Sequence, residues 1–137
     1  MTDGTPFQQS FEQVTTRLRA AGCVFAEEEA RLLLDQVGGR DGEASAREAE
    51  LESLVARRVA GEPLEHLVGW AEFGGLRLMV RPGVFVPRAR TLVLVHEALR
   101  LLDADRTGPS GRDVVLDLCC GSGAIGAALL HAVPGLQ

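Results

Sequence analysis

The residues most capable of chemistry lie in one short stretch, VVLDLCCGSGAIG, which covers residues 114–126. An apolar run reaches Asp117, two adjacent cysteines follow, and three glycines stand at GxGxxG spacing. Residues 114–118 are expected to form a buried parallel strand, and residues 124–133 the helix that follows it. Glycines between a strand and a helix let bare backbone approach a ligand. The stretch therefore predicts a Rossmann-like cofactor site.

The charge of Asp117 separates two classes of cofactor. A dinucleotide places its pyrophosphate at the helix N-terminus, where a carboxylate would repel it. S-adenosylmethionine has no phosphate and carries a sulfonium and an α-ammonium group, which a carboxylate attracts. Asp117 therefore favours S-adenosylmethionine. A structural role, in which Asp117 caps the turn by accepting backbone N–H groups, stays open.

The cofactor floor is expected to consist of this aspartate and the turn that follows it. Its members are Asp117, Cys119, Cys120, Gly121, Ser122 and Gly123. A third metal ligand at recognisable spacing is absent from the sequence, so small turn residues explain the cysteines better than a metal or redox site does. We expect a side chain at Cys119 to cost little if its φ is negative. No residue of the chain is predicted to be catalytic.

Hydrophobic residues recur at helical spacing through the first 70 residues and predict a small bundle. Glu27 to Glu29 are expected to form the solvated first turn of one helix. Val59 is expected on the buried stripe of the third helix. The predicted helices run from Pro6, capped by Thr5, to Gly22; from Glu27 to Gly38; from a Ser45/Glu48 capping box to Gly61; and from Pro63 to about Gly69.

The spacing changes after residue 72. Leu76, Leu78 and Val80 alternate with other residues, Pro82-Gly83 signals a turn, and residues 84–86 are expected to return as the second strand of a hairpin. Residues 90–102 resume helical spacing through Leu92, Val95, Leu99 and Leu102.

Composition excludes several classes of function. The formal net charge is −5, which disfavours general nucleic-acid binding. All 14 basic residues are arginine, so no mechanism can use a lysine nucleophile. The first ten residues lack the pattern of a secretory signal, and charge and glycine interrupt the longest apolar stretch, residues 114–133. A cytoplasmic protein with reduced cysteines is expected.

Linked signatures give a more specific indication. GEPL, EFGGL, PGVFVPR and LDLCCGSGAI occur in this order between residues 61 and 125. Together they resemble the HemK/PrmC family of protein-(glutamine-N5) methyltransferases. The resemblance implies an α/β protein with a helical substrate-recognition domain over residues 1–70, a β-hairpin linker over 71–88, and the start of a Rossmann-like class I methyltransferase domain over 89–137.

The resemblance is to a diverged branch of that family. The family's PRPETE segment reads PRARTL here, which keeps Arg88 and Thr91, and its DLGTGSG reads DLCCGSG, with Cys119 in place of a glycine. Arg88 and Thr91 are candidates for the edge of the substrate pocket, although surface solvation explains them equally well. His66 stands where a tyrosine is often found. The family's NPPY motif and a second acidic residue for the ribose are not in the chain, which indicates an N-terminal fragment.

The resemblance implies an S-adenosylmethionine-dependent enzyme that methylates a glutamine of a protein substrate such as a peptide chain release factor. One alternative is a binding or dimerisation module without chemistry of its own. A nicotinamide-dependent oxidoreductase is a second alternative, which Asp117 disfavours.

Overall fold

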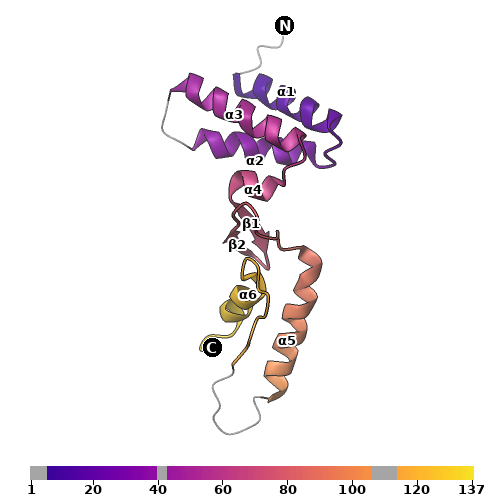
Figure 1. Ribbon diagram of the computed structural model, residues 1–137, viewed down its shortest axis with the longest axis vertical. Coiled ribbons are helices and arrows are strands. Elements are labelled where there is room, and N and C mark those ends of the chain that lie inside the picture. Colours follow the sequence, from indigo (N-terminus) through magenta and orange to yellow (C-terminus); the bar gives the residue numbers. More distant parts are fainter. Residues whose placement is uncertain (1–5, 40–42, 106–113) are drawn as a thin grey trace. The chain divides into compact units, whose positions relative to one another are not determined.

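The computed structural model describes residues 6–39, 43–105 and 114–137 of the chain. Among these residues the protein is mixed α/β and mostly helical, with one two-stranded sheet. The chain divides into two compact units, Met1–Val68 and Gly69–Gln137, called below the helical unit and the hairpin unit (Figure 1). Within the described ranges, no helix is both long enough and apolar enough to cross a membrane.

Four helices form the helical unit. They are α1 (Pro6–Ala20), α2 (Ala26–Gly38), α3 (Ala44–Val59) and α4 (Leu64–Val68). The first three pack against one another, and α4 contacts α2 and α3. Because apolar residues recur every three or four positions, each helix turns one face toward a shared core. The buried apolar residues are Val14, Leu18, Ala26, Ala30, Leu33, Leu34, Val37, Leu54, Val55, Leu67 and Val68. The four predicted helices are confirmed over the described residues; the predicted cap at Thr5 lies outside them.

The ends of α3 differ from the prediction. Ser45 was expected to cap the helix, but α3 begins at Ala44 and its N-cap residue is Glu43, which makes no side-chain capping bond. The Glu43 carbonyl already accepts hydrogen bonds from the amides of Ala46 and Arg47, at 3.1 and 3.2 Å. Ser45 therefore lies inside the first turn. Val59, expected on the buried stripe, is the last residue of the helix and is 43% exposed.

Glu29 is buried and forms an ion pair between α2 and α3, so the expectation that Glu27 to Glu29 are all solvated is wrong for Glu29. Arg58 donates from Nε and Nη2 to the two carboxylate oxygens of Glu29, at 2.7 and 3.0 Å. These hydrogen bonds raise the pKa of Arg58. Partial burial, and then the charge of Glu29, raise the pKa of the nearby Cys23 thiol. The side chains of this pair are the least exposed among the described ion pairs, so water screens this link between the two helices least.

The hairpin unit opens with two antiparallel strands, β1 (Trp70–Phe73) and β2 (Leu76–Met79). Phe73 pairs with Leu76, so the connection is Gly74-Gly75, with φ of +58° and +79°. Positive φ at both central residues is the requirement of a type I′ turn, which glycine meets without strain. The predicted hairpin paired the strand at residues 76–80 with residues 84–86, whereas in the structure that strand pairs with β1. Residues 84–86 form no strand, because the amide of Val84 bonds to the Arg81 carbonyl at 3.0 Å and closes a turn.

Helices α5 (Leu92–Asp105) and α6 (Ala124–Ala132) pack on each other beyond the hairpin, and a 3-10 turn, η1 (Ala89–Thr91), leads into α5. The buried cluster consists of Phe73, Val95, Ala124, Ala128, Leu129 and Leu136. Leu92, Leu99 and Leu102 pack against it, as their spacing predicted. Both predicted helices of this unit are therefore confirmed, and α6 ends one residue before Val133.

The predicted strand over residues 114–118 does not form. Residues 114–117 follow an extended trace (Figure 1), but they have no regular secondary structure and belong to no sheet, and Leu118 begins a turn. The amide of Val115 bonds to the carbonyl of Gln137 at 2.8 Å. A strand needs a neighbouring strand to receive its hydrogen bonds, and the described residues offer none beside this segment. The predicted Rossmann-like strand and helix unit is therefore not confirmed: the described residues form a segment outside any sheet, a turn and α6.

Candidate functional site

The turn over residues 117–123 leads from the extended segment into α6. Gly123 is the N-cap residue of α6 and has a left-handed backbone with φ of +72°. Its amide bonds to the Cys120 carbonyl at 2.8 Å, and its own carbonyl accepts the Ala127 amide at 2.9 Å. A side chain here would strain the backbone, which explains the glycine. The N–H groups of the first helical turn point out of the helix end, toward the turn.

Asp117 is half-buried and accepts a hydrogen bond at Oδ2 from the backbone amide of Gly126, at 3.2 Å. Gly126 is the third residue of α6, so the bond is the one that a capping side chain makes at a helix N-terminus. Here the cap comes from a residue nine positions away. Asp117 therefore has the structural role that the sequence left open, because its side chain caps α6. It also holds the carboxylate in a fixed position beside the turn.

Cys119 has a φ of +58° and is the one described residue other than glycine with a positive φ. The expectation that a side chain costs little at this position required a negative φ, and that condition is not met. The left-handed region crowds Cβ against the backbone, at a cost of about 1 kcal/mol. A glycine, the residue typical of the family at this position, would be free of that cost.

The remaining predicted cofactor residues expose backbone and small side chains. Cys120 and Gly121 are exposed and Ser122 is half-buried. A Cβ added to Gly121, or to Gly123 at the N-cap of α6, would meet no atom within 4 Å, so open space lies over both glycines. Among the described residues, no three His, Cys, Asp or Glu side chains gather where they could hold a metal ion. The turn can therefore offer a ligand backbone amides and one carboxylate.

Arg88 and Thr91 come just before α5 in the sequence, whereas the turn over residues 117–123 comes after it. Arg88 is exposed, with its guanidinium 5.6 Å from the centre of the Phe85 ring. Thr91 is half-buried in η1, and its amide bonds to the Arg88 carbonyl at 2.8 Å. Within the described residues, no hydrogen bond or ion pair connects either of them to the turn over residues 117–123.

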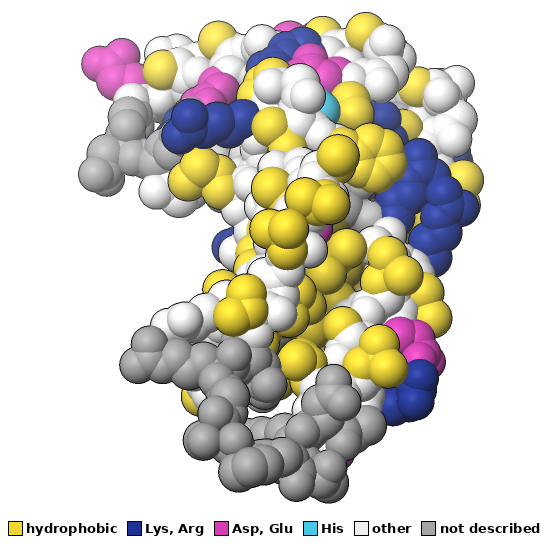
Figure 2. Space-filling model, turned by 60° about the horizontal axis from the view of Figure 1, so that its bottom comes forward, with side chains coloured by type: hydrophobic (Ala, Val, Ile, Leu, Met, Phe, Trp, Pro, Cys, Tyr) yellow, Lys and Arg dark blue, Asp and Glu magenta, His cyan; other side chains and the backbone are white. Residues whose placement is uncertain are grey.

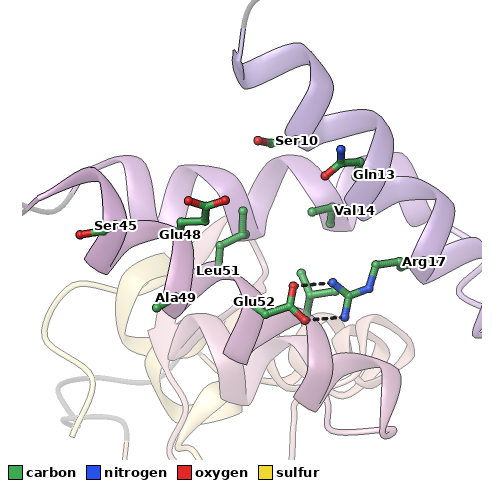
Figure 3. Close-up of a pocket in the computed structure, with 10 residues that line it drawn as sticks. Ser10, Gln13, Val14, Arg17, Ser45, Glu48, Ala49, Leu51 and Glu52 are labelled. Atoms are coloured by element: carbon green, nitrogen blue, oxygen red, sulfur yellow. Dashed lines mark hydrogen bonds and ion pairs between the residues drawn. The ribbon is translucent and has the colours of Figure 1, made fainter.

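A groove between α1 and α3 is a second concave site, which the sequence did not predict (Figure 3). Val14, Leu51 and Val55 contribute its apolar lining. On its rim Arg17 donates to both carboxylate oxygens of Glu52, at 2.5 and 2.8 Å. The pair neutralises both charges at this edge. Two helices far apart in sequence form the groove, so no local sequence signal could reveal it.

The hairpin unit also exposes much apolar surface. Figure 2 shows hydrophobic side chains, in yellow, gathered on one face of the molecule. Large apolar side chains more than half exposed in α5, α6, the extended segment and the turn after it are Val93, Leu94, Leu101, Val114, Leu116, Leu118 and Leu130. An apolar surface of this extent is uncommon on a soluble domain that has no partner.

Comparison with known proteins identifies the class of domain to which the helical unit belongs. Residues 9–69 match the model of the PrmC N-terminal domain, a range that covers nearly all of α1 and all of α2 to α4. The helical unit is therefore a domain of this class. Curated relatives extend the match over most of the chain, and the resemblance to the HemK/PrmC family is confirmed.

The relatives share one description, release factor glutamine methyltransferase. The protein from Bifidobacterium longum is 38% identical over 91% of this chain and 46% of its own length. The protein from Streptomyces coelicolor is 41% identical over 89% of this chain and 44% of its own length. The protein from Geobacter sulfurreducens is 43% identical over 65% of this chain and 29% of its own length. The chain thus spans less than half the length of these curated relatives.

Proposed function

We propose that this chain is the N-terminal portion of an S-adenosylmethionine-dependent methyltransferase that modifies a glutamine side chain of a protein substrate such as a peptide chain release factor. In this proposal residues 1–70 recognise the substrate, residues 71–88 link the domains, and residues 89–137 begin the Rossmann-like domain. The observation that carries it is the fixed carboxylate of Asp117 beside the open glycine backbone of the turn. The shared description of the relatives supports the same reaction.

The residues of the turn suit the proposed cofactor. Asp117 would attract the positive α-ammonium and sulfonium groups and would repel a pyrophosphate. The open space over Gly121 and Gly123 leaves room for a ligand against bare backbone. Cys119, Cys120 and Ser122 would complete the floor, mainly through their backbone amides.

When bound, S-adenosylmethionine supplies a methyl group made electrophilic by the adjacent sulfonium. An amide nitrogen is a poor nucleophile, so the protein must act mainly by positioning and by hydrogen bonds that localise the nitrogen lone pair. In this chain Asp117 would orient the cofactor, and its bond to Gly126 keeps the carboxylate from rotating away. Arg88 and Thr91 would lie at the edge of the substrate pocket. We assign no catalytic residue within the 137 residues.

The exposed apolar surface of the hairpin unit fits the same proposal. In this proposal the extended segment over residues 114–117 would pair with parallel strands, and the Val115 amide would give up its bond to the Gln137 carbonyl. Parallel sheets carry helices on both faces, so a helix would cover Leu116, and the sheet itself would cover α6 side chains such as Leu130. The segment would then become the first strand of the methyltransferase sheet.

The test is calorimetric titration of the chain with S-adenosylmethionine and, separately, with NADH. Asp117→Asn keeps an oxygen that can accept the Gly126 amide but removes the charge. We expect saturable heat with S-adenosylmethionine, and affinity about tenfold lower in the Asn variant, because roughly 1.4 kcal/mol of charge attraction is lost.

Asp117→Ala, which removes both the charge and the cap, is the companion variant. It should lose cofactor affinity and also stability, by about 1 kcal/mol. Equal affinity in the unchanged chain and the Asn variant would contradict the proposed role of the charge. Heat with NADH but not with S-adenosylmethionine would indicate the oxidoreductase alternative, and heat with neither would favour a binding module.

A further inference from the structure

Residues 69–91, called here the connector, concentrate positive charge in an otherwise acidic chain. They contain Arg77, Arg81, Arg88 and Arg90 and one acidic residue, Glu72, which gives a net charge of +3. The whole chain has a net charge of −5, so the residues outside the connector carry −8. All four arginines are exposed.

These arginines differ from five others in the described part of the protein. Arg17, Arg19, Arg57, Arg58 and Arg100 each form an ion pair with a glutamate. In the part of the chain that the structure describes, the four connector arginines form no ion pair. Their charge is therefore available to a partner.

Apolar side chains lie among these charges. The two outward residues of β1, Trp70 and Glu72, pair across the sheet with Met79 and Arg77. Met79 is 70% exposed, and Phe85, farther along the connector, is 67% exposed. Exposed aromatic, methionine and arginine side chains together are the composition of protein interface centres.

Two of the arginines are held over aromatic rings. The Arg77 guanidinium lies 3.8 Å from the centre of the Trp70 ring, and that of Arg88 lies 5.6 Å from the centre of the Phe85 ring. A guanidinium that stacks by its face keeps its N–H edge free for a carboxylate, in the forked geometry that arginine favours. Stacking also reduces the side-chain freedom that binding would otherwise remove.

We infer that the connector is a docking surface for an acidic segment of the protein substrate, with carboxylates on its arginines and an apolar side chain on Met79 or Phe85. This inference rests on the proposed function, because it assumes a protein substrate. A protein partner is favoured over a nucleic acid because the strongly negative remainder of the chain would repel a long phosphate backbone. A short acidic segment needs only the connector.

The test measures binding of a short fluorescein-labelled peptide that repeats two glutamates and a leucine. Fluorescence anisotropy should show saturable binding that weakens as salt is added, because exposed charges are screened. A peptide with glutamine in place of glutamate should bind much more weakly. Arg77→Gln and Arg81→Gln should each reduce affinity about threefold, and the variant that combines them with Arg88→Gln at least about tenfold.

Arg31→Gln is the matched control. Arg31 is also exposed and lies 5.4 Å from the centre of an aromatic ring, that of Phe11, but it belongs to the helical unit. Its replacement should leave peptide affinity unchanged. Circular dichroism of each variant checks that it folds, and glutamine at position 77 avoids placing a like charge opposite Glu72.

Three results would overturn the inference: no binding of the acidic peptide, equal loss in the control and connector variants, or tighter binding of a single-stranded RNA of similar length at the same salt. A chain that binds the peptide but gives no heat with S-adenosylmethionine would contradict the proposed function alone. A chain that binds S-adenosylmethionine but not the peptide would contradict this inference alone.

Discussion

Two adjacent residues of the turn, Cys119 and Cys120, illustrate how much of a residue's effect depends on its backbone. Both are exposed cysteines, but only Cys119 has a positive φ. Sequence comparison with the family's motif located the unusual side chain correctly. It could not give the sign of φ, because that depends on how the turn enters α6.

Opposite effects are therefore predicted for the same substitution at these two positions. Cys119→Gly should raise the free energy of unfolding of the hairpin unit by about 0.5 kcal/mol. The substitution relieves the left-handed strain of the folded state, and this gain exceeds the loss caused by the greater conformational entropy of the unfolded chain. Cys120→Gly should destabilise it by a similar amount, since only the entropy cost remains. Urea unfolding followed by Trp70 fluorescence measures both; destabilisation by Cys119→Gly would contradict the strain.

A second residue prediction concerns a buried hydroxyl in α1. Thr15 is buried, and its Oγ1 has no hydrogen-bond partner among the residues that the structure describes. Thr15→Val keeps the shape and removes the unsatisfied group, so we expect a gain of about 1 kcal/mol in the free energy of unfolding. The neighbouring Thr16 is the control, because it is exposed and bonds to the Glu12 carbonyl at 2.8 Å. Thr16→Val should give no gain, and equal effects would show that the Thr15 hydroxyl is satisfied.

At the scale of elements, periodicity predicted the helices and the strand β2, but it failed for residues 84–86 and 114–118. A helix makes its hydrogen bonds within itself, so its spacing and ends can be inferred locally. A strand depends on its neighbour, which is why the segment over residues 114–118 was predicted wrongly. The true hairpin did leave a signal: Gly74-Gly75 between alternating residues is the pattern of a two-residue loop. Pro82-Gly83 is a competing turn signal, and it favours a hairpin with residues 84–86 that does not form.

The glycines at the start of α6 allow a prediction at this scale. Gly126 lies inside the helix with an ordinary backbone, and an added Cβ would be 3.5 Å from Asp117 Oδ2, an ordinary contact. Gly126→Ala should therefore stabilise α6 by about 0.5 to 1 kcal/mol through helix propensity. Gly123→Ala should cost about 1 kcal/mol or more, because its φ is +72°.

Thermal unfolding of the two variants measures this contrast. If Gly126→Ala were destabilising, the cap from Asp117 would require a closer approach than the structure shows. The glycine at 126 would then be needed for packing rather than tolerated.

Across the whole molecule, charge and burial divide between the two units. The helical unit closes its own core and pairs most of its described arginines with glutamates. The hairpin unit carries the glycine turn, the unpaired arginines of the connector and most of the exposed apolar side chains. Under the proposed function, cofactor binding and the docking of an acidic segment would thus depend on exposed surfaces of the hairpin unit, and the helical unit, which carries the groove, would add further recognition of the substrate.

This division predicts that acid destabilises the helical unit through its ion pairs. Hydrogen bonds from Arg17 and Arg57 lower the pKa values of Glu52 and Glu62 below the usual 4.5. Because the folded state has the lower pKa, these pairs stabilise it above pH 4.5, and the contribution is lost as the pH falls below that value.

Far-UV circular dichroism follows mainly the helical unit, and Trp70, the single tryptophan, reports on the hairpin unit. Unfolding in urea, followed by circular dichroism and repeated as the pH falls through this range, should show a loss of stability. Glu52→Gln should make this loss smaller. Glu48→Gln, a control variant on the same groove, should leave the loss unchanged. An identical pH dependence in both variants would show that the Arg17–Glu52 pair contributes nothing to the fold.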